Sequence, residues 1–251
     1  MLIPDPTPPR RPGCLAPESL PAPAEGSVLP LPAVAGPVAV LSAHPDDEVI
    51  GAGRLVAHLA GTVGATAHCA TAGEGCYLGR PVPGVDDVGA VRRAEWLAAV
   101  AALGARPGRW GGLPDGALDA RPDELAAWVA AVLEESAPSA VLVPWRLDPH
   151  PDHAALGEVV AREAGRRGIE VLEFPVWATV WCRPEQLAAT GWRLAVVGTP
   201  AHTEAAREAA LYCYPSQTTE QVPGWGAVVP PGALAHHGVQ RLAVGAPGEV
   251  A

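Results

Sequence analysis

The feature that most constrains the fold is an alternation of short apolar runs with helical patterns. Residues 37–43 and 139–145 are almost continuously apolar, which is typical of strands buried on both faces of a sheet. Residues 64–71 suit a further strand, and 171–181 and 192–197 are strand-rich. Apolar residues at helical spacing predict helices over 48–61, 88–103, 122–135, 153–167 and 201–213. We therefore predict an α/β, Rossmann-like layered fold, with a mostly parallel sheet flanked by helices and a strand-rich C-terminal part.

The first 36 residues differ from the rest of the chain in their frequent prolines, such as Pro8, Pro9 and Pro12. This composition predicts an extended arm with little structure of its own. The arm is either a plain tail or a segment that packs on the domain or on a sister subunit. We divide the chain into this arm, residues 1–36, and one domain, residues 37–251, which is long enough to bury a substantial core.

Charge and cysteine content argue against several classes of protein. A formal net charge of −10 disfavours nucleic acid and anionic membrane surfaces as partners, because both call for faces rich in Lys and Arg. The five cysteines form no CxxC pair, which indicates reduced thiols and not a disulfide framework. Prolines interrupt the N-terminal segment, and no apolar run is long enough to span a bilayer. We expect a cytoplasmic protein without membrane contact, and leave open whether it forms a homo-oligomer.

Two polar clusters follow the two continuously apolar runs. Residues 44–48 (HPDDE) come after the first run and residues 150–153 (HPDH) after the second, each just before a predicted helix. Open parallel sheets bind ligands at the carboxyl ends of their strands. A spacing of three residues lets two side chains of each cluster point the same way. These pairs are His44 with Asp47, and His150 with His153.

The residue types of both clusters suit a catalytic metal site. Imidazole nitrogens and carboxylate oxygens are ligands of zinc, so the clusters together can supply three ligands and leave a fourth position for water. Fe²⁺ or Co²⁺ can also occupy such a site. Asp46 could then accept a proton from the water, and His150 could stabilise an oxyanion or protonate a leaving amine. Asp152 could hold an imidazole in one tautomer.

Each cluster taken alone has an ordinary explanation. Acidic residues at a helix start complement the helix dipole, and an HxxH pair is more often a surface or core feature than a ligand pair. Two such clusters at two strand ends favour the metal site. Two other residues are set aside: His68 lies inside a predicted strand and suits the core, and Cys76 has no paired histidine that would make it a nucleophile.

The clusters resemble the signatures of the LmbE-like (PIG-L) deacetylase family. Residues 43–48 (AHPDDE), followed by two glycines, resemble its first signature, and residues 150–153 its second. Weaker matches are residues 71–75 (TAGEG), Arg92 with Glu95, residues 113–116 (LPDG) and Ser216-Gln217. The resemblance thus spans residue 38 to about 218 in the family's order.

The resemblance implies a zinc-dependent amidase that removes an N-acyl group, usually acetyl, from a small molecule containing an amino sugar. By matching position, His44, Asp47 and His153 would be the metal ligands. Asp46 resembles the general base, and His150 resembles the residue that stabilises the tetrahedral oxyanion.

The resemblance also assigns secondary roles. Asp152 would orient a histidine, and Arg92 and Asp115 would line the substrate site. Residues 212–215 (YCYP) depart from the family, in which His or Lys often precedes the late Ser-Gln, so the substrate stays open. Alternatives are an amidase that acts on a sugar-linked thiol conjugate or a non-sugar N-acyl amide, and a metal-binding protein that has lost activity.

Overall fold

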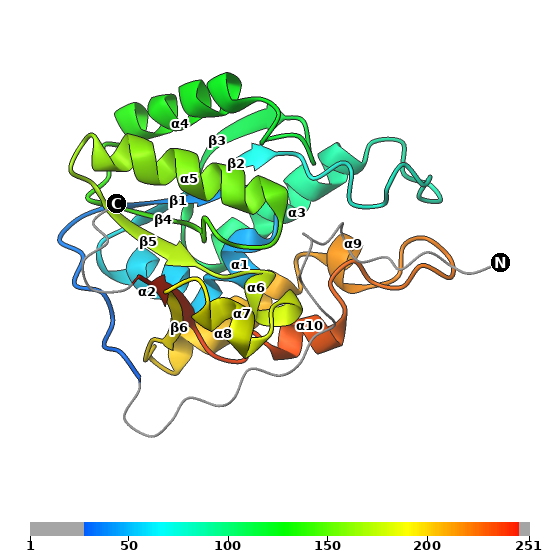
Figure 1. Cartoon of the computed structure of the whole chain (residues 1–251). Coiled ribbons are helices and arrows are strands. Elements are labelled where there is room, and N and C mark those ends of the chain that lie inside the picture. Colours follow the sequence, from blue (N-terminus) through cyan, green and yellow to red (C-terminus); the bar gives the residue numbers. More distant parts are fainter. Residues whose placement is uncertain (1–27, 246–251) are drawn as a thin grey trace.

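The computed structural model describes residues 28–245, and a single seven-stranded sheet runs through this part of the chain. The strand order is β3-β2-β1-β4-β5-β7-β6. The first five strands in this order run parallel, whereas β7 is antiparallel to both β5 and β6 (Figure 1). The strands are β1 (Val38–Ser42), β2 (Ala65–Thr71), β3 (Arg106–Leu113), β4 (Ala140–Pro144), β5 (Glu170–Phe174), β6 (Arg193–Val196) and β7 (Arg241–Val244).

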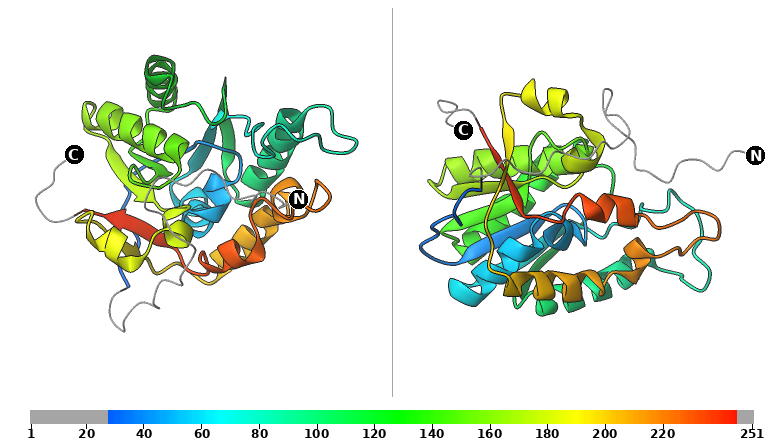
Figure 2. Two further views of the ribbon diagram at one scale, coloured as in Figure 1. Left: turned by 45° about the vertical axis from the view of Figure 1, so that its right-hand side comes forward. Right: turned by 90° about the horizontal axis from the view of Figure 1, so that it is seen from below.

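Helices cover both faces of this sheet, which confirms the predicted α/β fold (Figures 1 and 2). Helices α4 (Pro122–Ser136) and α5 (Pro151–Gly165) pack on one face. Helices α2 (Gly53–Thr62) and α3 (Val88–Ala102) pack on the other, and α8 (His202–Leu211) packs against both of them. The remaining helices are short: α1 (Asp47–Ile50), α6 (Ala178–Trp181), α7 (Pro184–Ala188), α9 (Pro215–Thr218) and α10 (Pro231–Ala235).

Strand β1 shows why the apolar runs are continuous. All five of its residues are buried. Val38 and Val40 join the core beneath α2 and α3, while Ala39 and Leu41 join the core beneath α4 and α5. Because alternate residues of a strand point to opposite faces, a strand covered on both sides needs apolar residues throughout.

The order of the strands reverses between β1 and β4. The chain proceeds outward from β1 through β2 to β3, and then returns to place β4 on the other side of β1. In open α/β sheets a crevice forms at such a reversal, outside the carboxyl ends of the strands. Residues 44–48 follow β1 and residues 150–153 open α5 after β4, so both polar clusters lie at this crevice.

The structure differs from the sequence-based expectations in three places. Strand β3 was not predicted, and it is a largely exposed edge strand with the sequence RPGRWGGL, which lacks an apolar pattern. The prediction of strand over 171–181 is wrong beyond Phe174, because Ala178–Trp181 is helix α6. Helix α10 and strand β7 lie near the C-terminal end of the described residues, where no individual element was predicted.

Most of the predicted N-terminal arm, residues 1–27, lies outside the described residues. Within residues 28–36, Leu29 forms a parallel bridge with Val197, and Leu31 and Val34 pack against the main core. No helix within residues 28–245 has the length and apolar character needed to cross a membrane.

Candidate active site

The loop after β1 is held in a strained turn. Oδ2 of Asp47 accepts hydrogen bonds from the backbone N–H groups of Ala43 (3.0 Å) and His44 (2.9 Å). Asp46 has a φ of 115°, in the left-handed region that non-glycine residues rarely adopt, and its carbonyl accepts the N–H of Ile50 at 2.9 Å. Such conformations concentrate at functional sites, where the surrounding contacts maintain them.

The three buried side chains of His44, Asp47 and His153 converge at this turn. Nδ1 of His44 lies 3.2 Å from Nε2 of His153, and Oδ1 of Asp47 lies 3.1 Å from the same Nε2. Oδ2 of Asp47 is 3.7 Å from Nδ1 of His44. A tetrahedral ion with bonds of about 2.05 Å separates its ligand atoms by about 3.3 Å, so this donor set fits a divalent metal.

Two wider groups of ligand-type atoms surround His44. Ring nitrogens of His44, His150 and His153 lie within 4.8 Å of one another, and so do ligand-type atoms of His44, Asp115 and Asp152. In the second group His44 uses Nε2, which is 3.0 Å from Oδ1 of Asp115 and 3.1 Å from Oδ2 of Asp152. Nδ1 of His44 therefore remains available toward His153.

Asp148 was not among the predicted site residues, yet it holds His153 in place. Its Oδ1 lies 3.1 Å from Nδ1 of His153, and its Oδ2 accepts the backbone N–H groups of residues 176–178 at 2.9–3.0 Å. Because an ionised carboxylate only accepts, His153 donates to Asp148 through Nδ1, so Nε2 is the nitrogen that faces the converging set. The only sequence signal for Asp148 is its place in residues 148–153 (DPHPDH).

Electrostatics separate the two aspartates of the turn. Burial raises the pKa of Asp46 to about 8, although the nearby Arg92 guanidinium acts in the opposite direction. Burial also acts to raise the pKa of Asp47, but His153 and His44 outweigh it and hold that pKa well below its usual range. Burial lowers the pKa of His153, but Asp47 and Asp148 outweigh burial and raise it to about 9. Two neighbouring carboxyls are thus set up for different tasks.

Arg92 fastens Asp46 in the turn. Its Nη2 is 3.2 Å from Oδ2 of Asp46 and also donates to the carbonyl of Pro45, while its Nη1 donates to the carbonyl of Gly73 at 2.8 Å. The residue is only 2% exposed. Both terminal nitrogens of Arg92 are therefore engaged by the protein itself.

The buried side chain of Glu48 also contacts the turn. Its Oε1 accepts the hydroxyl of Tyr214, and its Oε2 lies 3.3 Å from both the Ser42 hydroxyl and the backbone N–H of Asp46. Burial raises the pKa of Glu48 to about 7. The Tyr214 contact joins the turn to the chain beyond α8. Glu48 belongs to the predicted cluster of residues 44–48, where it was given no role of its own, and Tyr214 was not predicted to belong to the site.

His150 and Asp152 take different positions at the start of α5. Nδ1 of His150 accepts the N–H of Asp152 at 3.3 Å, so a neutral His150 carries its proton on Nε2. Burial lowers the pKa of His150 to about 3, which favours this neutral form. Asp152 accepts the N–H groups of Gly116 (2.8 Å) and Leu118 (3.0 Å), and the histidine that its side chain contacts is His44.

The site opens into a cavity of about 250 Å³. Six of the eight predicted site residues line it, whereas Asp152 and His153 lie behind them. The six are His44, Asp46, Asp47, Arg92, Asp115 and His150. The cavity thus brings the converging metal-type ligands, a buried carboxyl and an imidazole N–H donor around one space, which is the arrangement of a hydrolytic centre.

Comparison with known proteins places this geometry in a family. The family model described as "PIG-L: GlcNAc-PI de-N-acetylase" matches residues 39–164, which include both polar clusters. Among curated proteins, no significant match to the chain is found.

Several solved structures share the fold. The zinc-inhibited form of teicoplanin deacetylase Orf2 is 19% identical, with a TM-score of 0.57 over 71% of this chain and 83% of that chain. N,N'-diacetylchitobiose deacetylase from Pyrococcus horikoshii is 20% identical, with a TM-score of 0.54 over 75% and 71%. GalB, the 4-carboxy-2-hydroxymuconate hydratase from Pseudomonas putida KT2440, is 21% identical, with a TM-score of 0.53 over 80% and 82%.

These likenesses establish the architecture, and the hydratase among them shows that the architecture alone does not determine the reaction. The family model, by contrast, matches the sequence itself, and residues 39–164 make up half of the chain. This chain belongs to the PIG-L family.

Proposed function

We propose that this protein is a metal-dependent hydrolase that removes an N-acyl group, acetyl in the first instance, from a small molecule containing an amino sugar. The observation that carries this proposal is the position of Asp46. Asp46 lines the same cavity as His44, Asp47 and His150, and its Oδ2 lies 3.2 Å from Nη2 of Arg92. The family description and the two deacetylases among the similar structures support an N-acetyl amide as the bond.

In this proposal Nδ1 of His44, Nε2 of His153 and the carboxylate of Asp47 hold the ion, and zinc suits two nitrogens and one oxygen. Fe²⁺ and Co²⁺ are compatible with the same donors. An ion bound there supplies Lewis-acid activation of water and of the amide carbonyl.

Asp46 acts as the general base and then as the general acid. It takes a proton from the attacking water and returns it to the departing amine, so that one amide and one water yield a carboxylate and an amine. Its raised pKa suits a group that accepts and then releases a proton near neutral pH. Arg92 holds the carboxyl for this role and, with both terminal nitrogens engaged, need not contact the substrate.

His150 stabilises the developing oxyanion. With Nδ1 occupied by the Asp152 N–H, its Nε2–H is the donor that can serve the cavity. Asp115 lines the cavity with its side chain 10% exposed, and in this proposal it accepts hydrogen bonds from sugar hydroxyls. Asp152 fixes the orientation of His44, and Asp148 that of His153.

The test is a panel of acyl amides assayed with the zinc-loaded protein, with free amine and free carboxylate both measured. We expect release of both from N-acetylglucosamine derivatives. Asp46→Asn should retain the metal, measured by elemental analysis, and lose at least about 10²-fold in kcat. Full activity of this variant would refute the assignment of Asp46.

The same panel separates the alternatives. Cleavage of a sugar-linked thiol conjugate or a non-sugar amide, without cleavage of any simple N-acetyl sugar, would replace the proposed substrate and keep the site. Metal binding without turnover of any acyl amide would indicate a metal-binding protein.

A further inference from the structure

The catalytic cavity is lined by apolar as well as ionisable side chains. Besides the cluster of ionisable groups, six apolar side chains line it: Ile50, Leu78, Val176, Trp177, Val228 and Val229. Trp177 stacks on Trp181 with ring centroids 4.4 Å apart and an interplanar angle of 13°, so its ring is fixed in place. A molecule that fills this cavity must therefore present apolar surface beside the bond that reacts.

Two loops make the outer part of this wall. Residues 72–87 connect β2 to α3, and residues 219–230 connect α9 to α10. Both project beyond the sheet side by side, in teal and orange in Figures 1 and 2. We call their three cavity-lining apolar residues, Leu78, Val228 and Val229, the apolar collar.

The two loops are tied together, so the collar has a defined shape. The guanidinium of Arg80 lies 4.1 Å from the centroid of the Trp225 ring. At the base of the loops, the hydroxyl of Tyr77 donates to the carbonyl of Ser216 at 2.5 Å. These contacts join the first loop to the C-terminal part of the chain without using any collar side chain.

Leu78 departs from two ordinary expectations. Its φ is 52°, in the left-handed region, which is an outlier for a bulky residue, and its side chain is 58% exposed although it lines the cavity. Asparagine or glycine would be less strained there. A strained backbone that presents an exposed leucine at the mouth of a catalytic cavity indicates that the leucine contacts a ligand.

The collar offers no free positive charge. Among the described residues that line the cavity, Arg92 is the one arginine, and it is bound to Asp46. Arg80 on the first loop lies over Trp225. A phosphate or carboxylate held inside the cavity would therefore meet no arginine other than Arg92, whereas an uncharged group needs no such partner there.

We propose that the substrate carries an uncharged apolar substituent next to its amide, which packs against the apolar collar while the amide lies at the cluster of ionisable groups. The substituent is an alkyl or aryl group, attached either to the anomeric oxygen of the sugar or to the acyl chain. This inference rests on the proposed function, and it leaves the balance of the reaction unchanged: one water is consumed and one amine and one carboxylate are formed.

The test is a pair of substrate series assayed with the zinc-loaded full-length protein. One series consists of N-acetylglucosamine and its methyl, butyl, hexyl and octyl glycosides, and the other of glucosamine acylated with two to eight carbons, all below their micelle concentrations. Along one series, kcat/KM should rise about fourfold per buried methylene, through KM and not kcat. The series that rises identifies where the substituent is attached.

Leu78→Asn tests whether the collar is responsible. Asparagine tolerates the left-handed backbone, so the variant should fold, which its melting temperature will show. The ratio of kcat/KM between the longest and the shortest substrate should fall about tenfold. Leu97→Asn is the matched control, because Leu97 is 43% exposed on α3 and does not line the cavity. This control should leave the ratio unchanged.

The outcomes are distinguishable. If N-acetylglucosamine is hydrolysed but both series are flat or falling, or if Leu78→Asn keeps the ratio of the unmodified protein, the apolar substituent is refuted and the proposed function stands. If no member of either series releases amine, the proposed function fails.

Discussion

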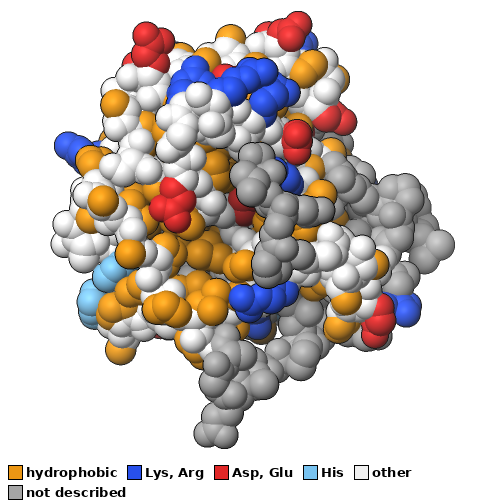
Figure 3. Space-filling view, turned by 60° about the vertical axis from the view of Figure 1, so that its left-hand side comes forward, with side chains coloured by type: hydrophobic (Ala, Val, Ile, Leu, Met, Phe, Trp, Pro, Cys, Tyr) orange, Lys and Arg blue, Asp and Glu red, His pale blue; other side chains and the backbone are white. Residues whose placement is uncertain are grey.

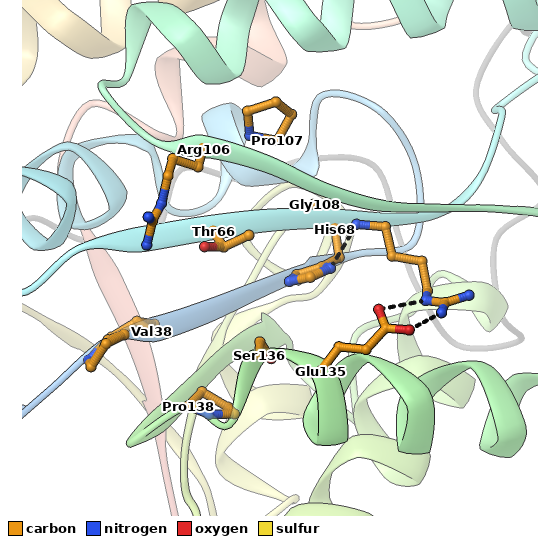
Figure 4. Close-up of a pocket in the computed structure, with 11 residues that line it drawn as sticks. Val38, Thr66, His68, Arg106, Pro107, Gly108, Glu135, Ser136 and Pro138 are labelled. Atoms are coloured by element: carbon orange, nitrogen blue, oxygen red, sulfur yellow. Dashed lines mark hydrogen bonds and ion pairs between the residues drawn. The ribbon is translucent and has the colours of Figure 1, made fainter.

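Two cavities at opposite ends of the same sheet differ in what their histidines contact. The catalytic cavity lies beyond the carboxyl ends of β1 and β4, with a volume of about 250 Å³. A larger cavity, of about 560 Å³, lies where β1, β2 and β3 begin and α4 ends (Figure 4). If the candidate active site were chosen by cavity volume alone, the larger cavity would be chosen instead of the one that holds the two polar clusters.

The far cavity is built around His68. Its Nδ1 accepts the backbone N–H of Arg109 at 2.9 Å, and its Nε2 has no hydrogen-bond partner among the described residues. The one carboxylate that lines this cavity, Glu135, is turned toward the Arg109 guanidinium and is more than half exposed (Figure 4). At the catalytic end, by contrast, His153 lies between two buried carboxylates.

The same residue type consequently titrates in opposite directions at the two ends. Burial lowers the pKa of His68 to about 4, because no buried anion compensates for it. Buried carboxylates raise the pKa of His153 to about 9 in spite of burial. Where anions and imidazoles converge, a cation is stabilised, so only the catalytic end is prepared to hold a metal ion. Figure 3 shows another face of the molecule, where hydrophobic side chains gather in a broad area and basic side chains form a patch near the top.

Substituting one histidine at each end of the sheet should give the largest difference in metal affinity and activity. His153→Gln removes a proposed ligand and should lower metal affinity and kcat/KM by at least about 10³-fold, whereas His68→Gln should leave both within about twofold. Metal titration of the chelator-treated proteins and amine release measure the two effects. An equal loss of metal in both variants would mean that the ends do not differ as described.

Asp148→Asn should have an intermediate effect. An amide NH₂ facing Nδ1 of His153 would favour the tautomer with its proton on Nε2, which is the wrong one for binding a cation. We expect metal affinity to fall about 10–100-fold, together with a changed ¹⁵N shift pattern of His153 in the metal-free protein.

Glu173→Gln is the matched control, since Glu173 is also a buried carboxylate but accepts from Arg146 alone. Its metal affinity should be unchanged. If Glu173→Gln lowered the metal affinity as much as Asp148→Asn does, the effect would come from the loss of any buried charge and not from the contact of Asp148 with His153.

The smallest effect concerns stability against acid at the far end. The folded-state pKa of His68 is depressed below that of the unfolded chain, so its contribution is fully present above about pH 6.5 and is lost as pH falls toward 4. Between pH 7 and 5 the free energy of unfolding should decline by about 2 kcal/mol more in the unmodified protein than in His68→Gln. Denaturant titrations at several pH values measure this difference, and parallel curves would contradict it.

Much of the sheet could be predicted because its central strands are buried on both faces. The run at 37–43 is apolar throughout since β1 is covered by helices on either side. Strand β3 escaped prediction for the converse reason: it is an exposed edge, and Gly111 is needed where the backbone approaches the Ala70 carbonyl and Trp128. Helix α6 was not predicted because the backbone N–H groups at its start and just before it, those of residues 176–178, are bound by Asp148, a residue 28 to 30 positions earlier.

The candidate site could be predicted only in part, because some of its residues are joined by contacts between distant parts of the sequence. The two clusters could be predicted because several polar residues follow directly after apolar runs. The structure brings residues of both clusters to one cavity. The contact of Tyr214 with Glu48 spans 166 positions, and the contacts of Asp148 with the N–H groups of residues 176–178 span 28 to 30, so neither leaves a local pattern in the sequence. The position of Arg92 was expected, but the engagement of its guanidinium by Asp46 depends on how α3 packs.

The neighbourhood of β1 and β4 has a consequence for assembly. His44 and His153 are 109 positions apart, and the chain between them contains the three strands β2, β3 and β4 and three of the helices that cover the sheet, α2, α3 and α4. A chain synthesised only as far as α4 would contain His44 and Asp47 but not His153, the third proposed ligand. An ion bound between these two histidines closes a loop of that length, so metal occupancy would report that the parallel core is complete and would hold it closed.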